Sequence, residues 1–219
     1  MAAPLKVLVV DVGGHHVKVL APGRRAPIKI DSGPLMTARE MVRQVLAAAS
    51  GWQYDVVSIG FPGPVKRGRP WREPVNLGTG WVGFDFARAF GCRVRIINDA
   101  AMQALGSYRG GRLLFLGLGT GLGTALVFDG TVVPMELAHL PYTKGRTYED
   151  EVGAAGLKKH GKKRWRRDVL DITTRFRAVF GADDVVIGGG NARHLKTLPK
   201  GVRLGSNAHA FVGGVRLWE

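Results

Sequence analysis

Three glycine clusters could hold phosphate, because each follows a predicted strand. They are Gly13 and Gly14; Gly119, Thr120, Gly121 and Gly123; and Gly189, Gly190 and Asn191. Without side chains, successive backbone N–H groups can turn inward and form a nest for phosphate oxygens. Tight hairpins and close packing also use glycine, so a single cluster decides little. Three clusters at strand ends favour phosphate binding, although none has the spacing of a P-loop or a dinucleotide fingerprint.

A carboxylate and a cation accompany the first cluster. Asp11 ends the first predicted strand just before Gly13, and Lys18 follows a few residues later. Such a carboxylate can hold Mg²⁺, directly or through water, beside phosphate oxygens, and Lys18 can add positive charge. Taken alone, an aspartate at a strand end is more often a turn former.

Asn98-Asp99 lies where a predicted strand meets a predicted helix. Phosphoryl transfer to an alcohol needs an aligned hydroxyl and a carboxylate that takes its proton, which Asp99 could supply. The alternative is that Asp99 only caps the helix. Planar polar side chains of the kind that bind sugars are Asn76, Asn98, Glu136, His139 and Glu149.

The elements that must position these residues can be read from the apolar pattern. Strands are predicted over 5–10, 15–20, 56–59, 94–97, 113–118, 124–128, 131–133 and 185–187. Helices are predicted after the capping box 37–40, after Asp85 up to Gly91, from 98 to 105, and over 162–180, before an apolar tail at 208–218. Hairpins mixed with helical crossovers in two halves indicate an α/β protein with mixed sheets.

Composition limits the partners. The 219 residues carry 32 Lys and Arg against 17 Asp and Glu, a net charge of +15, which favours a polyanionic partner over an acidic one. A generally basic proteome would give the same balance. The single cysteine, Cys92, permits no intrachain disulfide or cysteine zinc site. With no signal peptide and no apolar run of roughly 20 residues, we expect a cytoplasmic protein that does not enter a membrane.

Six short motifs occur in order along the chain. They are Asp11-x-Gly-Gly, Pro74-Val-Asn76-Leu-Gly, Gly80-Trp81-Val-Gly-Phe-Asp85, Asn98-Asp99-Ala, Leu116-Gly-Leu-Gly-Thr-Gly-Leu-Gly123 and Glu136-Leu-Ala-His139. This order resembles the ROK family of sugar kinases, and within it the polyphosphate glucokinases. The resemblance implies an actin-like ATPase (ribonuclease H-like) fold with two lobes around a cleft. We expect the lobes at 1–98, completed by the tail 206–219, and at 99–205.

The resemblance also implies roles for the candidate residues. Asp99 would be the base that activates the 6-hydroxyl of glucose, and the five planar polar residues would contact the sugar. Asp11, the glycines beside it and Lys18 would form the first phosphate motif, with Mg²⁺ at Asp11. The other two clusters would form the second motif and the nucleotide-side motif. Members of the family are commonly homodimers.

The chain departs from the family at identifiable positions. His15 stands where a threonine usually follows the paired glycines, so a hydroxyl donor to phosphate is lost. Glu151 stands where an aromatic residue is common. The cysteine-rich motif that binds zinc in most ROK proteins is missing, so no zinc is expected.

A basic run bears on the phosphate donor. It contains Lys158, Lys159, Lys162, Lys163, Arg164, Arg166 and Arg167. Such a run is usually a solvated helix face, but beside phosphate loops it favours polyphosphate over ATP alone, with use of both open. The alternatives are an ATP-dependent ROK hexokinase and a non-catalytic sugar or polyanion binder, the latter motivated by His15. No motif indicates specific nucleic-acid binding.

Overall fold

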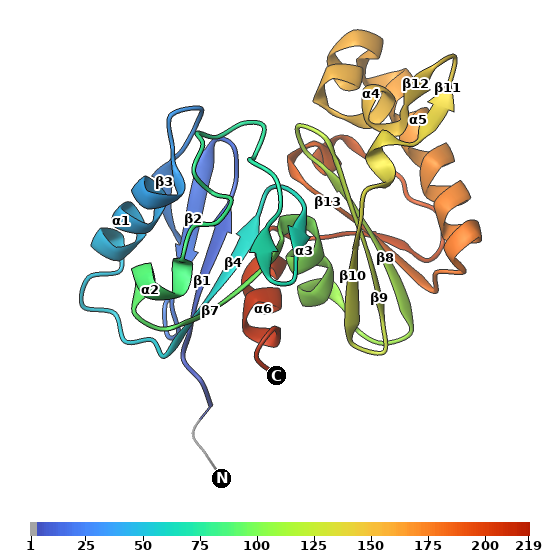
Figure 1. Cartoon of the computed structure of the whole chain (residues 1–219). Helices are drawn as coiled ribbons and strands as arrows, with labels where there is room; N and C mark the ends of the chain where they lie inside the picture. Colours follow the sequence, from blue (N-terminus) through green and yellow to red (C-terminus); the bar gives the residue numbers. More distant parts are fainter. Residues whose placement is uncertain (1–3) are drawn as a thin grey trace. The chain divides into compact units, whose positions relative to one another are not determined.

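The computed structural model describes residues 4–219, which divide into two compact units (Figure 1). Unit 1 comprises the residues up to Met102 together with Ala210–Glu219, and unit 2 comprises Gln103–His209. The division falls within helix α3 (Asp99–Ser107). Asp99 therefore belongs to unit 1, although the expected lobe boundary placed it in the C-terminal lobe.

Unit 1 is built on a five-stranded sheet with the order β3-β2-β1-β4-β7. Its strands are β1 (Val7–Val12), β2 (His16–Leu20), β3 (Ile28–Asp31), β4 (Val56–Phe61) and β7 (Arg93–Asn98). The first three strands form antiparallel hairpins, whereas β4 and β7 are added in parallel. A small hairpin, β5 (Val65–Lys66) and β6 (Arg69–Pro70), accompanies the sheet.

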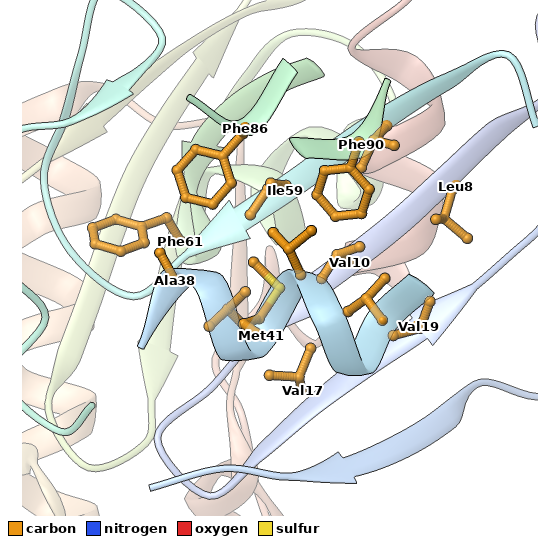
Figure 2. Packing of buried hydrophobic residues seen from close by; sticks show 14 of the residues in the cluster. Leu8, Val10, Val17, Val19, Ala38, Met41, Ile59, Phe61, Phe86 and Phe90 are labelled. Carbon is orange, nitrogen blue, oxygen red and sulfur yellow. The ribbon is translucent and has the colours of Figure 1, made fainter. Parts of the chain in front are cut away.

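Alternate residues of β1 enter two different cores, as the period of a strand requires. Leu8 and Val10 pack with helices α1 (Ala38–Ala48) and α2 (Phe86–Phe90), as Figure 2 shows. Val7 and Val9 pack on the other side with α3 and α6 (His209–Arg216). Burial on both faces explains why β1 is a continuous apolar run rather than an alternating pattern.

The C-terminal tail closes onto the sheet of unit 1 as helix α6. Gly214 lies so close to Val9 of β1 that a Cβ at this position would overlap the valine side chain. The Ser58 hydroxyl donates to the Gly214 carbonyl at 2.6 Å, and the indole of Trp218 donates to the same hydroxyl at 2.8 Å. The tail is thus an integral part of unit 1.

Unit 2 repeats the same sheet topology, in the order β10-β9-β8-β13-β14. Its strands are β8 (Arg112–Leu118), β9 (Leu122–Phe128), β10 (Thr131–Met135), β13 (Asp184–Gly188) and β14 (Val202–Leu204), with a separate hairpin of β11 (Pro141–Thr143) and β12 (Arg146–Thr147). Three strands are again antiparallel and two are added in parallel.

Unit 2 also contains helical elements. They are η1 (Leu137–His139), α4 (Tyr148–Val152), α5 (Ala154–Phe180) and η2 (Gly190–His194). Helix α4 begins at a capping box of Thr147 and Asp150. Trp165, Val169, Ile172 and Phe176 form the face of α5 that packs on β8 and β13. Val179, near the end of the same helix, is 76% exposed.

The predicted strands and helices are present, whereas the short elements β3, β5, β6, β11, β12, β14 and α4 were not predicted. Two further differences concern α5 and α1. Helix α5 begins at Ala154 rather than 162, and Gly161 interrupts it with φ 70° and ψ 165°. The part before 162 was not predicted because its lysines give no helical period of apolar residues. At α1, Thr37 accepts from the Glu40 N–H as predicted, but the Glu40 carboxylate pairs with Arg43 at 2.6 Å. No helix in residues 4–219 has the length and apolar character that a membrane span needs.

Candidate functional site

The first glycine cluster forms the turn of the β1–β2 hairpin. The Gly13 N–H donates to the His16 carbonyl at 3.0 Å, and the Ser32 hydroxyl donates to the Gly13 carbonyl at 2.6 Å. His15 is exposed at the tip of this turn. The turn therefore has a hydroxyl beside it, although His15 stands where a threonine was expected. It comes from Ser32, whose place at the turn could not be predicted because it is distant in sequence.

Asp11 and Lys18 are opposite each other in the β1–β2 ladder, so the hairpin register itself pairs them. Lys18 Nζ lies 3.2 Å from Asp11 Oδ2. Burial raises the pKa of the Asp11 carboxyl, and the charge and hydrogen bond of Lys18 oppose that rise. Lys18 thus helps to keep a buried carboxylate ionised beside the glycine turn.

The pKa of Asp11 predicts a pH dependence of stability. Because the folded pKa is raised, Asp11 adds stability below the ordinary aspartate pKa of about 3.9, and this contribution is lost as pH rises through the folded pKa. Asp11→Asn cannot titrate. The free energy of unfolding of the wild-type protein, relative to this variant, should fall from pH 4 to pH 7 in denaturant titrations.

Asp31→Asn controls for the loss of one carboxylate in the same unit, since the Asp31 side chain is 98% exposed. A tenfold difference in proton affinity at Asp11 would correspond to about 1.4 kcal/mol. A wild-type stability that rises with pH relative to Asp11→Asn would contradict the assignment.

Asn76 lies against the same turn. A Cβ on Gly14 would come within 3.0 Å of the Asn76 Cβ, so only a glycine lets the two segments approach this closely. Within unit 1, the structure therefore brings Asn76, which is expected to bind sugar, beside the turn that is expected to bind phosphate. Asn76 is itself exposed and available to a ligand.

Asn98 and Asp99 have separate roles at the start of α3. The Ala101 N–H donates to Asn98 Oδ1 at 3.1 Å, the contact of an N-cap, while Asn98 Nδ2 donates to the Gly63 carbonyl at 3.2 Å. Asp99 accepts from the Ala100 N–H at 2.8 Å and is half-buried. The capping role that we weighed for Asp99 is taken by Asn98, which leaves a fixed amide next to a carboxylate.

The second glycine cluster is the turn between β8 and β9, where the Gly119 N–H donates to the Gly121 carbonyl at 3.1 Å. Two of the three clusters are therefore hairpin turns. The Thr120 carbonyl accepts from the Ala154 N–H at 3.0 Å, which connects this turn to the start of α5.

Glu149 holds this turn from the side of α4. Its Oε2 accepts from the Leu122 N–H at 3.0 Å, and a Cβ on Gly121 would overlap the same carboxylate. The carboxylate is thereby fixed against the loop. Within unit 2, Glu149, which is expected to bind sugar, is thus held against the turn that is expected to bind phosphate.

Thr124 positions the Glu136–His139 segment. Its buried hydroxyl donates to the Met135 carbonyl at 2.7 Å and accepts from the Leu137 N–H at 3.3 Å, so both sides of Glu136 are tied to β9. His139 Nε2 lies 3.9 Å from Glu136 Oε2, and both side chains are exposed. Thr124 had no role in the sequence reasoning, because a threonine in a strand is ordinary.

The third cluster reaches the second through Asn191, whose Nδ2 donates to the Gly119 carbonyl at 2.9 Å. Gly189 has φ 83°, and a Cβ there would overlap the backbone of Leu118. The glycine is required both by its backbone angle and by this close approach. All of the unit 2 candidates except the basic run thus lie around one turn or are tied to its strands.

The basic run occupies both sides of the Gly161 interruption in α5. Its four lysines are exposed and form no ion pair within residues 4–219. Arg164 instead contacts Glu151 and Asp168, both at 3.4 Å, and Arg166 donates to the His194 carbonyl at 2.6 Å. Burial, followed by the charges of nearby cations that include Lys162, lowers the pKa of His194.

A buried carboxylate links this run to α4. Glu151 is completely buried and lies 2.6 Å from Arg146 Nε and 3.0 Å from His160 Nε2. A buried carboxylate is stable only with such partners. Arg146, His160 and Arg164 thus surround Glu151 with basic partners.

Known proteins resemble the chain in sequence and in fold. No family model matches the sequence. The polyphosphate glucokinase of Mycobacterium tuberculosis is 26% identical over 196 residues, covering 82% of this chain and 69% of the relative. That of Mycobacterium leprae is 25% identical over 205 residues, covering 85% of this chain and 60% of the relative.

The solved structures decide the fold. An inorganic polyphosphate/ATP-glucomannokinase from Arthrobacter sp. strain KM superposes with a TM-score of 0.82 at 22% identity, covering 98% of this chain and 100% of that one. The fold is that of the ROK sugar kinases. A ROK glucokinase from Streptomyces griseus, in complex with glucose and AMPPNP, gives 0.75 at 16% identity over 97% and 98% of the two chains. The expected fold class and resemblance are confirmed.

The Mg²⁺ expectation can be compared with the residues present. Within residues 4–219, no group of three or more His, Cys, Asp or Glu could hold a metal ion. Mg²⁺ in phosphate sites is commonly held by one or two carboxylates, with phosphate oxygens and waters completing its shell. The buried carboxylate of Asp11, as one protein ligand beside a phosphate turn, fits that role and not an all-protein cage.

Proposed function

We propose that this protein is a sugar kinase that transfers the terminal phosphoryl group of inorganic polyphosphate to the 6-hydroxyl of glucose. The arrangement at the start of α3 carries the proposal, because Asn98 caps the helix and Asp99 is a carboxylate beside a fixed amide. Sequence similarity to polyphosphate glucokinases supports the donor.

Each unit supplies its own part of the chemistry. Asp99 accepts the proton of the 6-hydroxyl as its oxygen attacks the terminal phosphorus, the bond from that phosphorus to the bridging oxygen breaks, and polyphosphate leaves one phosphate shorter. Asn98 and Asn76 orient the sugar. In unit 2, Glu149, Glu136 and His139 hydrogen-bond sugar hydroxyls. The backbone N–H groups of the Gly119–Gly123 turn and the Gly13–Gly14 turn stabilise charge on the phosphoryl oxygens. Mg²⁺ at Asp11, when bound, neutralises donor phosphate charge.

ATP is a second candidate donor, because one of the solved structures with this fold is that of an inorganic polyphosphate/ATP-glucomannokinase. Asn191 holds the third glycine cluster against the second glycine turn through its hydrogen bond to the Gly119 carbonyl. The exposed lysines of the basic run favour the polymer, because each phosphate contact releases condensed cations. We also propose that the enzyme acts in the cytoplasm. We propose further that it is a homodimer, and light scattering would test this by measuring the molar mass in solution.

The acceptor position gives a sharp test of the reaction. With polyphosphate as donor, glucose should yield one sugar phosphate in ³¹P NMR spectra, and 6-deoxyglucose should yield none. The deoxy sugar should still compete with glucose, because it retains the other hydroxyls. Phosphorylation of 6-deoxyglucose, or no product from glucose with polyphosphate and with ATP, would reject the proposal.

A further inference from the structure

A cavity of about 680 Å³ lies in unit 1, and none of the residues assigned to the reaction is among those that line it. It runs along β7, which is the edge strand of its sheet. Its walls come from the β5–β6 turn, the loop before α2, β7 and the C-terminal end. Arg67, Arg69 and Arg95 supply the positive charge of its lining, Asp85 adds one carboxylate, and side chains such as Phe84 and Ile96 supply the apolar part.

The cations at this cavity have no anionic partners. The surface, which we call the hairpin patch, comprises Lys66, Arg67, Arg69, Arg72, Arg93 and Arg95, all exposed. None of them forms an ion pair within the described part of the chain. The carboxylates nearby are engaged elsewhere, since Asp85 accepts from the Arg88 N–H and Glu73 accepts from the Trp81 N–H. The six cations of the patch outnumber these two carboxylates, so the patch carries a net positive charge.

Two tryptophans hold four of these cations in place. Lys66 and Arg72 lie over the Trp71 ring at 4.8 and 5.3 Å from its centre. Arg93 and Arg95 lie over the Trp218 ring at 5.4 and 4.4 Å, and Trp218 is itself fixed by Ser58. Cation–π contacts of this kind fix the direction of long basic side chains before any ligand arrives.

The backbone of Arg67 lies in the left-handed region, which is strained for a residue of this type. It occupies φ 51° and precedes Gly68 at φ 70°, in a two-residue turn that normally takes Asn-Gly or Asp-Gly. The β9–β10 turn of this chain follows that preference with Asp129-Gly130. A bulky residue kept in the left-handed region is a reason to look for a function.

We propose that the hairpin patch binds a segment of inorganic polyphosphate, as a contact additional to the glycine turns and the basic run of α5. The inference rests on the proposed function for its choice of ligand. A linear phosphate chain offers closely spaced negative charges and needs no aromatic surface. Single-stranded nucleic acid would need open rings for base stacking, and here both tryptophan rings already carry cations.

The test is calorimetric titration of the full-length protein with polyphosphate of defined length, without glucose, at several salt concentrations. Arg67→Asn should weaken binding by about three- to tenfold and lower the slope of log Kd against log salt by about one. Arg95→Gln should act in the same direction without altering the turn. Lys144→Asn is the matched control, because Lys144-Gly145 forms the same kind of turn, at φ 48° and 73°, in unit 2.

Arg67→Asn and Lys144→Asn should both raise the melting temperature by about 2–4 °C, because asparagine tolerates the left-handed region. Only the first should lose affinity by more than twofold. Equal affinities of both variants would overturn the site, even if the protein phosphorylates glucose from polyphosphate. A single-stranded oligonucleotide that displaces polyphosphate at lower concentration, with dependence on Arg67, would overturn the ligand. Arg67-dependent polyphosphate binding without phosphoryl transfer would uphold the site and reject the proposed function.

Discussion

Asp99→Asn abolishes sugar phosphorylation in our account, with kcat lowered by about 10²–10⁴ while glucose still binds. The reason is that the amide keeps the size and the hydrogen bond to the Ala100 N–H but cannot accept the proton of the attacking hydroxyl. Initial rates with saturating glucose, together with a separate measurement of glucose affinity, check this. A loss confined to affinity would assign Asp99 to binding alone.

Asp85→Asn is the matched control for this variant. Asp85 also begins a helix of unit 1, and its Oδ1 accepts from the Arg88 N–H at 3.0 Å. Asparagine caps helices about as well as aspartate, so this change should leave stability and kcat near those of the wild-type protein. An Asp99→Asn protein as active as Asp85→Asn would remove Asp99 from the reaction.

The second large effect is expected at Gly121. An alanine there must displace the Glu149 carboxylate, because its Cβ would overlap Oε2, which accepts from the Leu122 N–H. One methyl group would thereby disturb Glu149, which we propose to bind sugar, and the Gly119–Gly123 turn, which we propose to bind phosphate. A displacement of this kind costs about 10²-fold in kcat/KM for the sugar.

Gly119→Ala is the control within the same turn. No atom lies within 4 Å of a Cβ built there, and Gly119 is not among the glycines with positive φ. The two variants differ only in what the added methyl group meets. Equal activities of Gly121→Ala and Gly119→Ala would show that the Glu149 contact has no part in catalysis.

The sequence predicted the long buried strands better than the short hairpins and the exposed first part of α5, for a physical reason. The run at 5–10 is apolar throughout because β1 is buried on both faces, and such a run needs no partner to be recognised. The β5–β6 hairpin was missed because its strands have two residues each and its turn is Arg67-Gly68. The first part of α5 was missed because its exposed lysines give no apolar period.

The candidate site shows the same limit. Glycine clusters and Asn98-Asp99 are local signals, and the structure gives each a place at a strand end or a helix start. Contacts across the chain have no local signal: Ser32 reaches Gly13, and Glu151 meets Arg146 and His160 in a buried cluster. The division of labour between Asn98 and Asp99 also required geometry, because both residue types cap helices equally well.

The most direct test of the account compares phosphate donors on one preparation. Initial rates of glucose 6-phosphate formation should be measured with polyphosphate and with ATP at matched phosphate concentration, for the wild-type protein and Asp99→Asn. We predict formation from polyphosphate at a higher kcat/KM than from ATP, with both activities lost in the variant. Formation from ATP alone, or polyphosphate-dependent formation that survives Asp99→Asn, would contradict the account.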